Sequence, residues 1–285
     1  MLIAPATAAV LLVTAVATLV AFQNNDLFER WMFKPREILA GRQFERMLTS
    51  GFIHVDWPHF IFNAYSFYSF GETIEVIYGA KVLLLVHFSS ILGGSLLSLL
   101  IHRHHDYRAV GASGGVCGVI FASIFLLPGG GVTPLMIPVF IPGYVYAIVF
   151  LVFSFVGLRR HIGNVGHDAH LGGAIIGLLV ATALYPSVVM ADPRMFALVL
   201  IISIAILLLI LFDPLHLLEH RIEFGKTPAG DERSRRYELN RRRNQKLAEI
   251  DRLLDKVARD GIDSLSKSER KRLDQLSKEM NGGSS

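Results

Sequence analysis

Gly111–Ala112–Ser113–Gly114–Gly115 is a short polar, glycine-rich stretch at the head of an apolar run that continues from Val116 to Leu127. A serine in this position is usually inert, because its hydroxyl bonds to a backbone carbonyl one turn earlier. His167–Asp168–Ala169–His170–Leu171–Gly172–Gly173 opens a second apolar run in the same way. This recurrence predicts chemistry at the starts of two membrane helices.

The composition excludes an ordinary soluble domain. The chain has 285 residues, of which 52% are hydrophobic, and the apolar residues form blocks of membrane-spanning length. The first block, Leu2–Phe22, lacks a basic segment before it and is too long for a signal peptide, so we expect a retained span. The single cysteine, Cys117, has no partner for an internal disulfide.

Seven segments have the length and apolar character of membrane spans, so the sequence predicts an all-α polytopic membrane protein. Several are short or interrupted by glycine, which is tolerated where a span lines a wet cavity inside a bundle. The segments are Leu2–Phe22, His59–Ile77, Lys81–Ile101, Ser113–Leu127, Gly143–Leu158, Ala169–Tyr185 and Phe196–Phe212.

The connection Gln23–Pro58 interleaves aromatic and basic side chains, among them Trp31, Arg36 and Trp57. This composition is typical of the membrane interface, where rings lie at headgroup level and long cations reach water. A plain water-exposed loop is the alternative.

The character of the chain changes after Phe212. We expect a basic linker over Asp213–Arg243 that faces anionic lipid rather than nucleic acid. Asn244–Asp260 predicts an amphipathic helix, and Ser266–Lys267–Ser268–Glu269 has the spacing of a capping box before a second helix. The resulting hairpin tail is either a docking module, whose partner the sequence does not identify, or a solvated appendage.

Crossing parity places the polar residues together. His59, Ser113 and His170 begin the second, fourth and sixth spans, so they lie at similar depth on one side of the membrane. Asn63 follows His59 by one helical turn on the same face. Because buried polar groups in a bilayer are unfavourable without partners, we expect a shared cavity. Three separately satisfied residues are the alternative.

Glycines at spacing four favour close contact between the fourth and sixth spans. The pairs are Gly114 with Gly118 and Gly173 with Gly177. Small residues at this spacing let membrane helices approach backbone to backbone, which would bring Ser113 towards His170. Generic packing explains the glycines but leaves His170 without a role.

A serine and a histidine within hydrogen-bond reach suffice for nucleophilic acyl transfer. We therefore predict a catalytic dyad of Ser113 and His170. His59, the Asn63 amide and the backbone N–H of Ser113 are the candidate oxyanion donors. Asp168, two residues from His170, is predicted to be a cap or loop residue.

No metal or other cofactor is expected. A metalloprotease is disfavoured because the chain has no HExxH pair. The cluster His102, His104, His105 and Asp106 lies beside Arg103 and Arg108, and we interpret it as a solvated loop.

These motifs resemble those of the rhomboid family of intramembrane serine proteases. Gly111–Gly114 matches the GxSG motif, Ala169–Gly173 the AHxGG-like motif, and His59–Asn63 the HxxxN motif. Phe70–Glu75 resembles the family's glycine-then-glutamate stretch, and Arg46–His54 its run into the second span. The likeness covers about residues 1–185 and implies Ser113 as nucleophile, His170 as general base, and His59 with Asn63 in the oxyanion site. It also implies that the first loop lies in the membrane interface.

The sequence departs from the family pattern at three places. Cys117 stands where rhomboids often carry an aromatic residue packed on the catalytic imidazole, which leaves the support of the His170 ring open. Glu45 replaces a frequent tryptophan of the first loop, and Phe196–Phe212 is additional to the six-span core.

The resemblance implies a rhomboid-like six-helix bundle with one extra span and a small tail. The expected divisions are a six-span catalytic core (1–185), a seventh transmembrane segment (186–212), a basic linker (213–243) and a helical hairpin tail (244–280). The implied activity is cleavage of single-span or multi-span membrane proteins within the lipid bilayer, in a bacterial cell membrane.

Alternatives stay open at this point. A catalytically silent relative would bind membrane helices without cutting them, and a transporter or channel would use the polar cavity. Family precedent opens the active site to the non-cytoplasmic side, whereas the positive-inside tendency places the first loop and tail in the cytoplasm.

Overall fold

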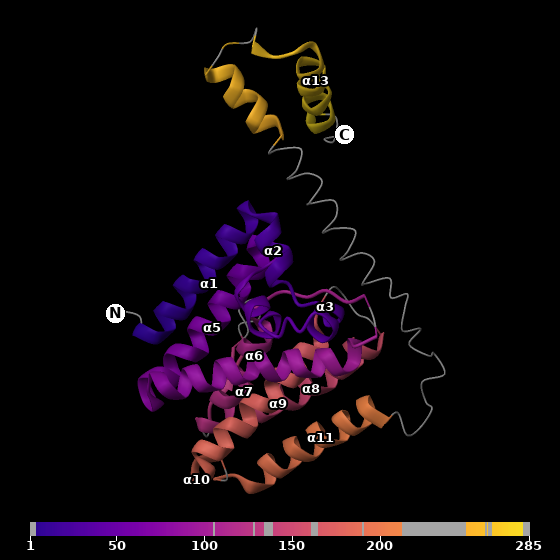
Figure 1. Cartoon of the computed structure of the whole chain (residues 1–285). Helices are drawn as coiled ribbons and strands as arrows, with labels where there is room; N and C mark the ends of the chain where they lie inside the picture. Colours follow the sequence, from indigo (N-terminus) through magenta and orange to yellow (C-terminus); the bar gives the residue numbers. More distant parts are fainter. Residues whose placement is uncertain are drawn as a thin grey trace. The chain divides into compact units, whose positions relative to one another are not determined.

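The computed structural model describes residues 4–104, 106–127, 129–133, 139–160, 165–189, 191–212, 249–259, 261 and 264–281 (Figure 1). The helices are α1 (Pro5–Gln23), α2 (Asn25–Trp31), α3 (Pro35–Ala40), α4 (Arg46–Thr49), α5 (Trp57–Tyr78), α6 (Ala80–His102), α7 (Ser113–Leu126), α8 (Gly143–Arg160), α9 (His167–Leu184), α10 (Pro186–Val189), α11 (Pro193–Phe212) and α13 (Lys267–Asn281). Residues 249–259 are also helical. A short 3-10 helix, η1 (Ser50–Phe52), precedes α5, and strands β1 (Gly131–Val132) and β2 (Ile141–Pro142) pair antiparallel between α7 and α8.

Five helices have the length and composition to cross a membrane, namely α1, α6, α8, α9 and α11. The prediction of an all-α, multi-pass membrane protein is confirmed. The 22-residue α5, which carries polar side chains, and the 14-residue α7 coincide with the other two predicted spans but are not among the five. The count of seven spans stays a prediction.

The short helix α7 lies at the centre of the fold. It packs against α5, α6 and α9 (Figure 1). The last thirteen of its residues are all buried except Ile124. At 1.5 Å per residue, fourteen residues extend about 21 Å, less than the roughly 30 Å of a hydrocarbon core. A helix of this length can cross a bilayer only where protein rather than lipid surrounds its ends.

Glu75 of α5 joins the end of that helix to the start of α1. Its buried carboxylate accepts hydrogen bonds from the amides of Ala6 (2.8 Å) and Thr7 (2.6 Å) and from the Thr7 hydroxyl (2.7 Å). The first amides of a helix have no partner within the helix and carry partial positive charge, so a carboxylate stabilises them.

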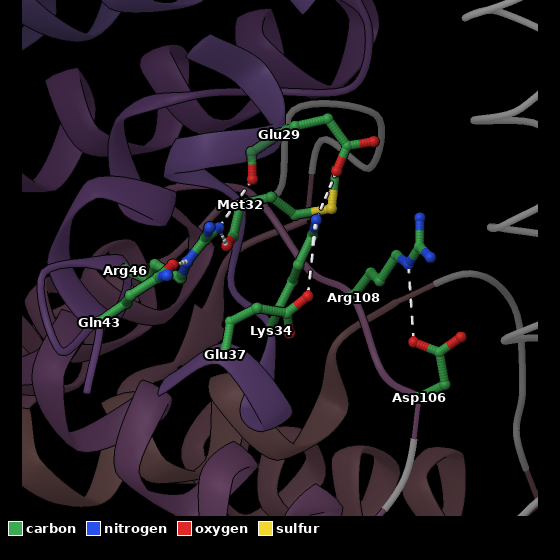
Figure 2. Close-up of polar contacts among 8 residues, drawn as sticks. All are labelled: Glu29, Met32, Lys34, Glu37, Gln43, Arg46, Asp106 and Arg108. Atoms are coloured by element: carbon green, nitrogen blue, oxygen red, sulfur yellow. Dashed lines mark hydrogen bonds and ion pairs between the residues drawn. The ribbon is translucent and has the colours of Figure 1, made fainter. Parts of the chain in front are cut away.

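The first loop is folded around Arg46, whose side chain is buried. Its guanidinium donates to the carbonyl oxygens of Glu29 (2.7 Å) and Met32 (2.8 Å) and to Gln43 Oε1 (2.6 Å) (Figure 2). Lys34 forms ion pairs with Glu29 and Glu37 in the same loop. The loop is thus a structured element that packs through α4 onto α6.

The chain divides into two compact units, and the second comprises residues 232–285. Within its described residues, Leu253, Leu265 and Leu276 are buried, and two ion pairs, Lys256–Glu269 and Arg272–Glu249, join residues 249–259 to α13. The predicted capping box is confirmed: Ser266 N–H donates to Glu269 Oε2 (2.8 Å), and Glu269 N–H donates to Ser266 Oγ (3.2 Å). The expected linker over residues 213–243 lies outside the described residues.

Candidate active site

Ser113 is the first residue of α7 and follows a turn that Gly111 makes possible. Gly111 has a φ of +131°, which L side chains rarely adopt, and its N–H donates to Ser50 O (2.9 Å). A Cβ at Gly111 would lie 2.7 Å from His59 Cε1. The His59 ring therefore lies directly against the turn that presents Ser113.

The start of α5 fixes the other two predicted site residues. Asp56 caps this helix by accepting from the His59 amide (2.8 Å). Asn63 is buried, 5% exposed, and its side-chain Nδ2 donates to His59 O (2.9 Å). An amide NH₂ has two donors, so Asn63 retains a second N–H for another acceptor.

His54 contacts the turn before Ser113. The sequence motifs did not assign this residue to the site. The ring is fully buried, and its Nε2 accepts from the Ala112 amide (3.3 Å). Because a backbone amide can only donate, Nδ1 carries the ring proton and donates to Thr18 Oγ1 (3.0 Å). The Thr18 hydroxyl in turn donates to Phe52 O (3.2 Å), so this chain of bonds joins α1, the first loop and α7.

Burial, followed by the charge of the nearby His59, lowers the pKa of His54 to about 3. The two rings are edge to face with centroids 5.0 Å apart. His54 is therefore neutral at ordinary pH, as its role as an acceptor requires.

α7 and α9 touch through glycine. A Cβ at Gly173 would overlap the carbonyl oxygen of Gly114, and a Cβ at Gly177 would overlap that of Gly118. A Cβ at Gly114 would lie 3.2 Å from Ala169 O. Gly114 directly follows Ser113 in the chain, and Ala169 directly precedes His170. Ser113 and His170 therefore both lie at the amino-terminal ends of two packed helices.

Aromatic rings of α8 and α9 surround the His170 imidazole. Phe150 stacks on it with centroids 6.3 Å apart and 28° between the planes, and His167 meets it edge to face at 6.2 Å. Cys117 is buried in α7 and offers no ring. The aromatic support that the sequence left open therefore comes from α8, through a residue that no motif distinguished from its apolar neighbours.

Two interpretations of the sequence need correction. Asp168 is neither a cap nor a loop residue: Gly166 is the N-cap of α9, and the Asp168 side chain is buried in the first turn. His102 does not belong to a solvated loop, because it ends α6 and lies 3.3 Å from Asp168 Oδ2. The rest of that cluster is exposed where described, with Asp106 paired to Arg108 (3.7 Å) (Figure 2).

The fold and the site define a helical, multi-pass membrane protein with a serine and a histidine at adjoining helix starts. The family model of the Rhomboid domain matches residues 41–187, and the chain belongs to the rhomboid family. A second model, a family of unknown function (DUF6576), matches residues 235–279.

Curated relatives include proteins named as proteases. The chain is 26% identical over 184 residues to Rhomboid protease GluP of Bacillus subtilis (strain 168), covering 64% of this chain and 34% of that protein. It is 28% identical over 178 residues to RHOMBOID-like protein 12, mitochondrial, of Arabidopsis thaliana, covering 55% and 51%. It is 25% identical over 157 residues to Rhomboid protein 1, mitochondrial, of Saccharomyces cerevisiae (strain ATCC 204508 / S288c), covering 52% and 45%. The chain thus spans between a third and about half of the length of these relatives.

Proposed function

We propose that this protein is an intramembrane serine endopeptidase that cleaves the transmembrane segments of other membrane proteins through a dyad of Ser113 and His170. The observation that carries the proposal is the contact of Gly114 with Ala169, which sets the first turns of α7 and α9 against each other. Family membership and relatives named as proteases support the reaction class.

In the proposed reaction, His170 takes the proton from Ser113 Oγ as that oxygen attacks the scissile carbonyl carbon. The tetrahedral intermediate carries its negative charge on the former carbonyl oxygen. His170 then returns the proton to the leaving amine as the peptide C–N bond breaks. Water next attacks the acyl carbon while His170 takes its proton, and His170 returns a proton to Ser113 Oγ as the ester C–O bond breaks.

Three donors are proposed for the oxyanion: the His59 ring, the second N–H of Asn63 and the Ser113 amide. The first amides of a helix are not used within the helix and carry partial positive charge. Removing one such donor from a serine protease typically lowers kcat by about 100- to 1000-fold.

The proposed substrates are single-span or multi-span membrane proteins, and the bilayer is the medium in which they meet the site. The short central helix supports this, because fourteen residues are too few to cross the hydrocarbon core and a span of this length would have an end below the membrane surface. We further propose a bacterial cell membrane, supported by the Bacillus subtilis relative, and the division into core (1–185), seventh span (186–212), linker (213–243) and tail (244–280).

The second candidate is a catalytically silent protein that binds membrane helices. Such a protein has no need of both a serine and a histidine, whereas this chain has both at packed helix ends.

The deciding experiment incubates the purified, detergent-solubilised protein with a single-span membrane substrate, beside the Ser113→Ala variant. Cleavage by the parent alone supports the dyad. Equal cleavage by the parent and by Ser113→Ala would contradict the dyad. A folded parent that binds the substrate without cleaving it would favour the catalytically silent protein.

A further inference from the structure

Asp168 lies in a buried polar cluster that joins the end of α6 to the start of α9. The residue is 2% exposed. Its Oδ2 lies 3.3 Å from His102 Nε2, and the Tyr107 hydroxyl donates to its Oδ1 (3.3 Å). Oδ1 thus accepts a hydrogen bond and Oδ2 lies at ion-pair distance from a ring nitrogen, so residues from outside α9 face both carboxylate oxygens.

The start of α9 favours this arrangement electrostatically. His102 is the last residue of α6 and brings a ring nitrogen to the carboxylate. Asp168 is in the first turn of α9, where partial positive charge favours an anion. A buried carboxylate without such partners would be strongly unfavourable, so a displacement of Asp168 from His102 and Tyr107 would cost free energy.

Tyr107 extends the cluster to the first loop. Its ring lies parallel to that of His102, with centroids 3.8 Å apart and 4° between the planes, and meets Phe33 edge to face at 6.2 Å. Phe33 and Ala109 exchange two backbone hydrogen bonds (2.9 and 3.2 Å). The first loop, the loop before α7 and the start of α9 thus meet at one place.

His170 follows Asp168 by two residues in the same helical turn, and its N–H donates to Gly166 O (3.0 Å). A shift of the first turn of α9 would therefore carry the imidazole with it, and misplacement of a catalytic group by about 1 Å can lower the rate about 100-fold.

We propose that Asp168, held between His102 and Tyr107, is a positioning residue that fixes the first turn of α9 and thereby the His170 ring. The kinetic part of this proposal rests on the proposed protease function. The placement of α9 does not.

The test compares Asp168→Ala with Asp106→Ala in the full-length protein in detergent. Asp106 is the matched control, because it is an acid of a neighbouring loop whose side chain is 67% exposed. Two conservative variants accompany them. Tyr107→Phe keeps the ring on His102 and removes one hydrogen bond, and Asp168→Asn keeps an oxygen acceptor for Tyr107.

Hydrogen exchange of the peptide over residues 165–172 reports the position of α9 without requiring activity. We expect exchange about tenfold faster or more in Asp168→Ala and parental exchange in Asp106→Ala. For cleavage, we expect kcat to fall at least about tenfold in Asp168→Ala with KM within about twofold, and Asp168→Asn and Tyr107→Phe to lie between it and the parent.

Parental exchange and parental kcat in Asp168→Ala would overturn the proposal, as would a loss confined to KM. If the folded parent neither cleaves nor reacts with a serine probe, the protease function fails. The exchange result then decides alone whether Asp168 fixes α9.

Discussion

Phe150 of α8 stacks on the imidazole of His170 of α9, with ring centroids 6.3 Å apart. Two rings at this separation attract each other by about 0.5–1.5 kcal/mol beyond the area that they bury. The contact favours one orientation of the imidazole, and a fixed orientation is what a general base needs when it takes the proton of a serine. Phe150 also meets Phe121 of α7 edge to face at 5.4 Å, so its own ring is fixed by a second helix.

The first prediction concerns this ring. Phe150→Ala is expected to lower the rate at which Ser113 reacts by roughly 2- to 10-fold, the factor that corresponds to the loss of one aromatic contact. The rate at which a fluorophosphonate labels Ser113 is the measurement, because it reports the dyad without a protein substrate. Phe150→Tyr keeps the ring and should label like the parent. Parental labelling by a folded Phe150→Ala would show that the stack does not orient His170.

The second prediction separates the two histidines of α9. His170→Ala should be as inactive as Ser113→Ala, because the members of a dyad act as a unit. His167→Ala should retain most activity, since a Cβ at Gly157 would overlap the His167 ring and this histidine thus packs against α8. Both variants are measured for substrate cleavage and for probe labelling. If His170→Ala were active and His167→Ala inactive, the general base would be His167, nearly one helical turn from the predicted position.

Features encoded by local spacing could be predicted from the sequence. The capping box of Ser266 and Glu269 is an example, because both partners lie within one turn of the helix that they begin. The helices that start near His59, Ser113 and His170 are predicted by the same kind of pattern, in which apolar runs begin at polar or glycine-rich stretches.

The partners of single side chains could not be predicted, because tertiary packing decides them. Phe150 belongs to an apolar helix in which any of several rings could meet His170. His102 stands in a run of histidines and charges whose average character is solvated, yet it alone of the described members lies against Asp168. The hydrophobic or polar character of a sequence window is an average over its residues. It therefore cannot show that one residue, such as His102, has a buried partner while its neighbours are exposed.

The third prediction concerns the oxyanion site. Asn63→Ala should lower kcat by about 100- to 1000-fold with little change in KM, because its amide is expected to meet charge that develops only in the transition state. The double variant with His59→Ala should fall below either single variant. A loss confined to KM would instead make Asn63 a substrate-positioning residue, and parental rates in all three would remove α5 from the catalytic site.

The fourth prediction tests the junction of α5 and α1. In the parent, two carboxylate oxygens of Glu75 accept the hydrogen bonds from Ala6 and Thr7. In Glu75→Gln only one side-chain oxygen remains to accept them. Hydrogen bonds to charged groups contribute about 1.5–3 kcal/mol, so the unfolding free energy should fall by about that amount. Thermal unfolding in detergent is the measurement. Glu72→Gln is the control, because Glu72 is a half-buried carboxylate of the same helix, and an equal loss in this control would contradict the assignment.

The last prediction follows from the buried, neutral His54. An unfolded chain takes up a proton at this residue below its ordinary pKa of about 6.5, whereas the folded chain does not until its lowered pKa of about 3. Between these values the unfolded state binds more protons, so stability falls as pH falls, by about 1.4 kcal/mol per pH unit, and the loss ends below pH 3. His54→Gln keeps an acceptor for the Ala112 amide but does not titrate. At pH 7 the parent should have the higher Tm, and its advantage over His54→Gln should shrink steadily from pH 6.5 to 4.5. A Tm difference that stays constant over this range would mean that the ring is protonated as readily in the folded protein as in the unfolded chain, and the Ala112 amide would then need another acceptor to hold the Ser113 turn.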